Sequence, residues 1–185
     1  IMIAIPEKPL YLINKLNASG YKAYIVGGCV RDSILGLEPK DWDICTSATP
    51  EETATVFDEF DKIDNGIKHG TVGVIFNGEV FEITTFRSEG IYSDHRHPDN
   101  VRFEKNIEYD LARRDFTINA MAYNAEEGLV DIFDGRRDLM HGVIKCVGNP
   151  KTRFNEDALR ILRAIRFAGR FGFILSRDTK AAAFA

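Results

Sequence analysis

The chain has 185 residues, 44% of them hydrophobic, which is long enough for one domain with a core and part of another. Its net charge of −4 argues against a protein that coats nucleic acid, and three cysteines without paired spacing argue against a disulfide framework. No signal-peptide pattern and no apolar run of about 18 residues occurs, so we expect a cytoplasmic protein that does not span a membrane.

Helices and strands alternate in the first part of the chain. Apolar spacing, stop glycines and helix-start residues define them. The expected elements are a helix over 8–19, a strand over 21–28, a short helix over 29–36, a strand over 40–46 and a helix capped by Thr49.

The rest of the chain begins with a hairpin over 70–87, whose Asn77-Gly78 turn tolerates positive φ. A polar, mobile loop is expected after it. The remaining predicted elements are a helix over 107–124, a strand and turn over 128–135, a last strand over 143–150 and a helix over about 154–170. The pattern predicts an α+β fold, a mixed sheet backed by helices.

The segment "DWD" places Asp41 and Asp43 on one face of the predicted strand, with Trp42 packing on the other. Two carboxylates that point the same way stay ionised when a cation lies between them, and Mg²⁺ is the natural partner. An exposed strand face with two solvated aspartates remains the alternative.

Residues before and after this segment point to phosphate chemistry. Gly27 and Gly28 open a helix where exposed amides favour an anion, and Arg31 lies one turn further on. Glu82 in the hairpin is either a third carboxylate for the metal or a solvated strand residue. These features together favour a nucleotide-phosphate site over ordinary turns.

Two later segments are rich in arginine. Arg113, Arg114, Asp115 and Asn119 lie within two turns of a predicted helix, where they form either a triphosphate and sugar site or an ordinary charged helix start. On a helical wheel through 156–170, the arginines share one face, opposite to Ile161, Leu162 and Ile165, although Leu159 and Phe167 lie among the arginines. The arginine face belongs either to solvent or to a bound nucleotide.

Four segments in this order, "GGCVRD", "DWD", "RRDFTINAMA" and "EDALRILRAIRF", closely resemble the class II tRNA nucleotidyltransferase (CCA-adding enzyme) and bacterial poly(A) polymerase family. The resemblance implies a head domain over 1–148 with the nucleotidyltransferase fold of the DNA polymerase β superfamily, built on a mixed five-stranded sheet. It also implies that residues 149–185 begin an all-helical neck.

The resemblance further implies a role for each motif. Two Mg²⁺ ions would be held by Asp41 and Asp43, with support from Glu82. The nucleotide-binding residues would be Gly27, Gly28, Arg31, Arg114, Asp115, Asn119, Asp157, Arg160, Arg163 and Arg166. Of these, Asp157 and Arg160 would recognise the edge of the base, and the segment 89–99 would be the family's flexible loop.

The implied reaction is the addition of CMP and AMP from CTP and ATP to the 3′ end of tRNA, with release of pyrophosphate. Within the family, a poly(A) polymerase or A-adding enzyme is the alternative; outside it, a catalytically inactive nucleotide- or RNA-binding module. The chain ends soon after the arginine face, so we expect a fragment that binds nucleotide and metal but handles tRNA poorly.

Overall fold

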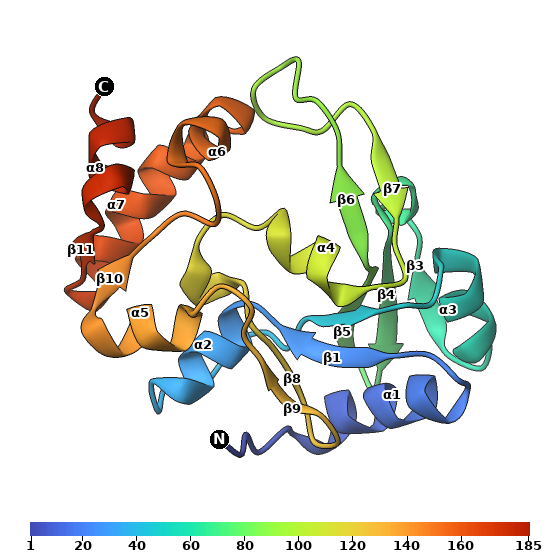
Figure 1. The fold of residues 1–185 in the computed structure, drawn as a ribbon. Coiled ribbons are helices and arrows are strands. Elements are labelled where there is room, and N and C mark those ends of the chain that lie inside the picture. Colours follow the sequence, from blue (N-terminus) through green and yellow to red (C-terminus); the bar gives the residue numbers. More distant parts are fainter.

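The protein forms eight α-helices and eleven strands, described for residues 1–185 by a computed structural model (Figure 1). The helices are α1 (Glu7–Ala18), α2 (Gly28–Ile34), α3 (Pro50–Val56), α4 (Ile107–Ala112), α5 (Gly135–His141), α6 (Pro150–Glu156), α7 (Leu159–Phe171) and α8 (Arg177–Ala183). The strands are β1 (Ala23–Val26), β2 (Ile44–Thr46), β3 (Asp61–Ile63), β4 (Thr71–Phe76), β5 (Glu79–Thr85), β6 (Arg87–Glu89), β7 (Val101–Phe103), β8 (Ala122–Asn124), β9 (Gly128–Val130), β10 (Val143–Ile144) and β11 (Ile174–Leu175).

Seven of the strands form one mixed sheet in the order β3-β4-β5-β2-β1-β8-β9. Strands β2 and β5 run parallel, and every other neighbouring pair is antiparallel. The predicted α+β class with a largely antiparallel sheet is confirmed. The sheet has seven strands where the resemblance implied five, and two further pairs, β6–β7 and β10–β11, lie outside it.

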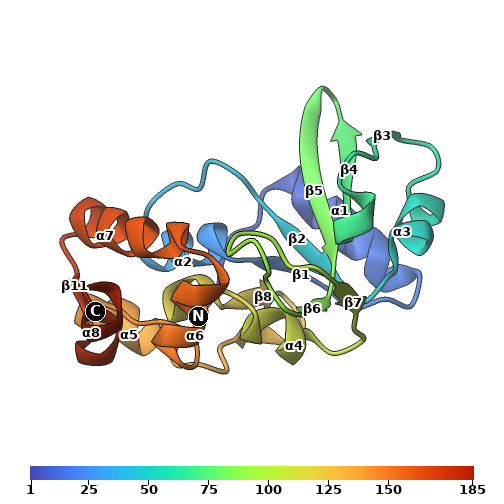
Figure 2. The same cartoon turned by 90° about the horizontal axis from the view of Figure 1, so that it is seen from above.

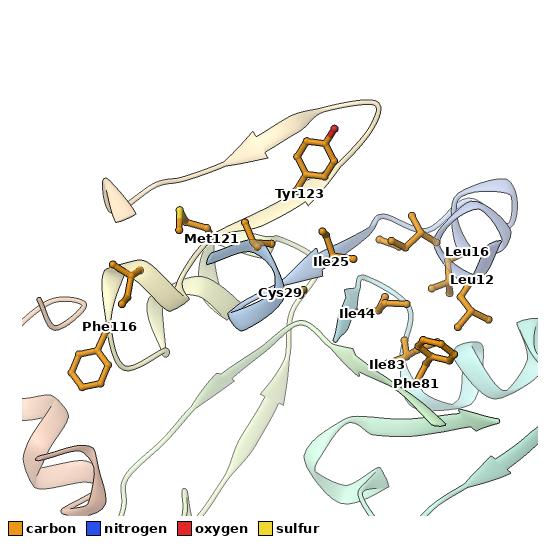
Figure 3. Close-up of a cluster of buried hydrophobic side chains, with 14 of the residues drawn as sticks. Leu12, Leu16, Ile25, Cys29, Ile44, Phe81, Ile83, Phe116, Met121 and Tyr123 are labelled. Atoms are coloured by element: carbon orange, nitrogen blue, oxygen red, sulfur yellow. The ribbon is translucent and has the colours of Figure 1, made fainter. Parts of the chain in front are cut away.

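Strand β1 is buried on both faces, which explains why its sequence is apolar without alternation. Ala23 and Ile25 belong to the main core of 23 residues, whereas Tyr24 and Val26 belong to a second cluster of seven on the other face. Figure 3 shows part of the main core, in which Leu12 and Leu16 of α1 lie near sheet residues such as Ile44.

Local signals correctly located several elements. In α3 the Thr49 side chain accepts a hydrogen bond from the Glu52 amide, and the Glu52 carboxylate accepts one from the Thr49 amide, which completes a capping box. The β4–β5 hairpin turns at Asn77 and Gly78, with φ values of 49° and 82°. It projects away from the rest of the molecule (Figure 2).

The helix predicted over 107–124 is wrong beyond Ala112. The Asp115 carboxylate accepts a hydrogen bond from the Phe116 amide at 2.7 Å, and Phe116 is extended, with φ −121°. Phe116 then bridges to Cys146, a short 3₁₀ turn follows over Thr117–Asn119, and β8 joins the sheet. A side chain that bonds its neighbouring backbone competes with the helix, and pairing with a distant strand decides the outcome.

The single helix predicted over about 154–170 is two helices. Asn149 caps α6, Asp157 leaves the helical region with φ −143°, and α7 starts at Leu159. The predicted apolar face is wrong in part, because Ile161 packs against the main core but Leu162 and Ile165 are exposed and Phe167 packs inward against Phe116. Helix α7 is rolled so that part of its arginine side faces the protein.

The C-terminal segment contains a short strand, β11, that pairs in parallel with β10. Thr179 of α8 accepts a hydrogen bond from the Cys146 amide at 3.1 Å, so α8 also contacts the residues before 149. The boundary between 148 and 149 therefore stays a prediction. None of the helices is long and apolar enough to cross a membrane.

Candidate active site

A cavity of about 410 Å³ opens between three parts of the chain: α2, α7 and the turn that follows α4. Figure 2 shows α2 and α7 close together. Ten of the predicted site residues line it: Gly27, Gly28, Arg31, Asp43, Arg114, Asp115, Asn119, Asp157, Arg160 and Arg163. Arg113, which the sequence offered only as part of an arginine-rich cluster, and Phe167, which was not predicted, complete the lining. Their sequence signals were present, since Arg113 precedes Arg114 and Phe167 lies on the arginine side of the wheel.

A second cavity of about 530 Å³ contains the other two predicted carboxylates, Asp41 and Glu82. Asp43 lines both cavities, so it marks the point where they meet. The structure therefore brings the metal and nucleotide candidates together. Arg166 is the exception: it is exposed on α7 and lines neither cavity.

The "DWD" segment lies directly before β2, not inside it. Asp41 and Asp43 are exposed, and Trp42 is half-buried against the main core, as the alternation predicted. The Asp43 carbonyl accepts a hydrogen bond from the Val26 amide at 3.0 Å, which continues the pairing with β1. Because Ile44 pairs with Ile83 in parallel register, Asp43 lies beside Glu82.

The three carboxylates have the donor chemistry of a divalent-cation site. Although Asp43 is open to solvent, it lies in a crowded recess, and partial burial raises its pKa, followed by the negative charges of Glu82 and Asp41. No group of three His, Cys, Asp or Glu side chains is close enough to form a complete metal site by itself. Mg²⁺ needs only one or two protein carboxylates when substrate phosphates and water supply its other ligands, so the set fits such an ion.

The glycine turn that opens α2 forms one end of the first cavity. Gly27 has φ +80°, and a Cβ there would lie 3.3 Å from Arg114 Nη1. A Cβ at Gly28 would lie 3.3 Å from Arg31 Nη2. Two arginines therefore approach this backbone as closely as glycine allows, which concentrates positive charge where an anion meets free amides.

The arginine pair at the end of α4 is held by one buried carboxylate. Asp110 is fully buried and lies 3.2 Å from Arg113 Nη2 and 3.0 Å from Arg114 Nη2. Burial alone would raise the pKa of Asp110, but the two arginines together hold it below its usual range. Asp110 thus fixes two neighbouring guanidiniums at the cavity wall.

A chain of polar contacts crosses the cavity floor. Arg163 Nη2 lies 2.6 Å from Asp115 Oδ2, and Asn119 Nδ2 donates to Asp115 Oδ1 at 3.2 Å. Arg31 Nη1 then donates to Asn119 Oδ1 at 2.6 Å. Residues far apart in sequence, on α2, the turn after α4 and α7, are therefore arranged as one set.

Asp157 and Arg160 both line the cavity and lie one turn apart, although Asp157 itself is outside the helix. Asp157 caps α7 by accepting a hydrogen bond from the Leu159 amide at 2.9 Å. Arg160 donates instead to Glu156 at 2.8 Å and to the Arg153 carbonyl at 3.1 Å. The Arg160 amide donates a hydrogen bond to the Asp157 carbonyl at 3.0 Å, so the two residues stay linked across the helix break.

The segment predicted as a mobile loop contacts this break. Tyr92 is buried and its hydroxyl donates a hydrogen bond to the Glu89 carboxylate. The guanidinium carbon of Arg160 lies over the Tyr92 ring, 5.8 Å from the ring centre. The His95 carbonyl accepts a hydrogen bond from the Ala158 amide at 3.1 Å. The mobility of the loop stays a prediction, but its position beside Arg160 was not visible in the sequence.

The fold is the nucleotidyltransferase head fold, and it brings the carboxylates, the glycine turn and the arginines together. Residues 23–145 match the model of the poly(A) polymerase head domain, and the chain belongs to this family. Nucleotidyltransferases of this family generally use divalent metal ions.

Named relatives agree with this assignment. A CCA-adding enzyme of Ligilactobacillus salivarius is 48% identical over 94% of this chain and 42% of its own length. The Bacillus stearothermophilus CCA-adding enzyme in complex with CTP matches with a TM-score of 0.85 and 43% identity over 95% of this chain and 42% of that one. A Thermotoga maritima CCA-adding enzyme complexed with tRNA matches with a TM-score of 0.76 and 31% identity over 97% of this chain and 42% of that one. The chain thus spans about two fifths of the length of these relatives.

Proposed function

We propose that the whole protein adds CMP and AMP to the 3′ end of tRNA in the cytoplasm, using CTP and ATP and releasing pyrophosphate. The observation that carries the proposal is Asp43, which lies between a cavity lined by arginines and one lined by carboxylates. A triphosphate in the first cavity would bring its phosphates to the carboxylates of the second. The similarity to CCA-adding enzymes supports this reaction over other nucleotidyl transfers.

Each group of residues has a part in this reaction. Arg31, Arg114 and the amides after Gly27 and Gly28 bind the triphosphate. Asp115 and Asn119 hydrogen-bond the ribose. Asp157 and Arg160 orient the base, with Arg163 beside them. This arrangement holds the α-phosphorus for in-line attack by the RNA 3′ oxygen, which forms a new P–O bond as the bond to pyrophosphate breaks.

Asp41 and Asp43 would hold two Mg²⁺ ions, with Glu82 adding negative charge beside them. Such ions, when bound, make the attacking hydroxyl more acidic and neutralise charge on the leaving pyrophosphate. The raised pKa of Asp43, caused by burial and by the charges of Glu82 and Asp41, supports a site that favours added positive charge.

The test supplies the whole protein with tRNA that lacks its CCA end, first with CTP alone and then with CTP and ATP. The proposal predicts products longer by two and then three nucleotides. Asp41→Ala should lower incorporation by about 100-fold or more, while Asp58→Ala, exposed after α3, should not. Lack of C incorporation by the unmodified protein would contradict the proposal.

A poly(A) polymerase or A-adding enzyme is the second candidate, because the matching family model is that of the poly(A) polymerase head. In the same assay it would incorporate AMP without prior addition of C. A catalytically inactive nucleotide- or RNA-binding module would incorporate neither nucleotide but would still bind CTP or RNA.

A further inference from the structure

Arg31, one of the triphosphate candidates, connects α2 to α7 through two aromatic rings. Its guanidinium carbon lies 5.1 Å from the ring centre of Phe167 and 5.1 Å from that of Phe171. The two rings are stacked, with centres 6.0 Å apart and planes 9° apart. Since 7% of the Arg31 side chain is exposed, water screens these contacts little, and a cation over an aromatic face is then strongly attracted.

The polar contacts of Arg31 point in other directions and leave the rings to hold the rest of the guanidinium. Nε donates to Asp32 at 2.9 Å, and Nη1 donates to Asn119 at 2.6 Å. Nη2 is the nitrogen nearest to Gly28, where the predicted triphosphate site begins. The orientation of this nitrogen is therefore set jointly by α2 and by the rings of α7.

Simple core packing does not account for the whole arrangement. Phe167 packs edge-on against Phe116, as a core residue would, but it also lines the nucleotide cavity. Two further arginines lie over the same rings: Arg163 is 5.4 Å from Phe167, and Arg170 is 4.7 Å from Phe171. Three guanidiniums thus share two rings, and Arg31, Arg163 and Phe167 of this group line the cavity, where an anion would offset the repulsion between the arginines.

We propose that Phe167 and Phe171 are positioning residues that hold Arg31 against the triphosphate and so link the triphosphate end of the cavity to α7. The proposal rests on the proposed function, which makes this cavity a nucleotide site. The contact involves the phosphates and not the base. The rings therefore contribute equally to the binding of CTP, ATP and inorganic tripolyphosphate.

The test compares Phe171→Leu with Phe171→Trp. Leucine keeps an apolar side chain but removes the ring, whereas tryptophan keeps a ring that attracts cations. Dissociation constants for CTP and for inorganic tripolyphosphate, each with Mg²⁺, are measured by calorimetry on the 185-residue chain and on the whole protein. We expect Phe171→Leu to raise both dissociation constants by about tenfold and Phe171→Trp to raise them by less than about threefold.

Phe184→Leu is the matched control, because Phe184 is exposed at the end of α8 and no cation lies over its ring. If Phe171→Leu does not fold, Phe171→Met is measured in its place. Unchanged affinity in a folded Leu or Met variant would overturn the inference, as would equal weakening by Leu and Trp. A wild-type protein that binds neither CTP nor tripolyphosphate would instead overturn the proposed function on which the inference rests.

Discussion

Gly27 shows how a single residue sets the geometry of the site. Its φ of +80° is a conformation that other residues adopt only with strain, and its open side faces Arg114 Nη1. The sequence alone identified a glycine pair before a helix, but ordinary turns also contain such pairs. The close approach of Arg114 is what distinguishes Gly27 from a turn glycine.

Gly27→Ala should therefore have two effects, and Gly36→Ala only one. Gly36 also has a positive φ, +74°, but no atom lies within 4 Å of its added Cβ. Each variant should lose about 1–2 kcal/mol of unfolding free energy from backbone strain. Only Gly27→Ala should also weaken CTP binding, by displacing Arg114. Urea unfolding and calorimetry measure the two effects, and equal CTP affinity in both variants would refute the role given to this contact.

At the scale of elements, α7 differs most from what the sequence predicts. Hydrophobic periodicity placed Leu162 and Ile165 inward and the arginines outward. In the structure, the contacts of Arg160 with Glu156 and of Arg31 with Phe167 turn part of the arginine side toward the protein and leave Leu162 and Ile165 exposed. These contacts pair residues across a helix break and between distant helices, which a wheel drawn for one continuous helix does not include.

Ile161→Ala and Ile165→Ala form a matched pair on α7 that tests this orientation. Ile161 packs against the main core, whereas Ile165 is 45% exposed. In the 185-residue chain, we expect Ile161→Ala to lower the unfolding free energy by about 1–2 kcal/mol and Ile165→Ala by less than about 0.5 kcal/mol. Equal losses in urea denaturation would favour the wheel over the structure.

Elements with strong local signals were predictable, and those decided by distant partners were not. The capping box of α3 and the Asn77-Gly78 hairpin depend on neighbouring residues, so their sequences were sufficient. The turn at Asp115 was mistaken for helix because the bridge from Phe116 to Cys146 crosses thirty positions of the chain. The motifs of the site were recognised, but the tie from Tyr92 to Arg160 required the fold.

At the scale of the whole molecule, the three cysteines report on the integrity of the fold. All are free and buried, and burial raises the pKa of Cys146 to about 11 from an ordinary value of 9.0. The folded state therefore binds the thiol proton more tightly than the unfolded state does. The contribution to stability is fully present below pH 9 and is lost as the pH rises toward 11.

Stability should consequently fall between about pH 9 and 11, and Cys146→Ala should reduce the size of this fall. Urea unfolding of the wild-type chain and the variant at pH 8 and pH 10.5 measures how much unfolding free energy each protein loses. The contributions of other groups that titrate in this range are the same in both proteins and cancel in the comparison. A thiol reagent at pH 8 should also react slowly until the chain unfolds. Rapid reaction of all three thiols in the folded chain would show that the core is more open than the structure describes.

We expect one nucleotide to occupy the arginine-lined cavity with its phosphates turned toward Asp43. A crystal structure of the protein with CTP and Mg²⁺ tests it most directly. We predict the triphosphate at Gly28, Arg31 and Arg114, the base at Asp157 and Arg160, and metal density beside Asp41 and Asp43. A triphosphate bound away from the glycine turn, or a base that contacts neither Asp157 nor Arg160, would contradict the account.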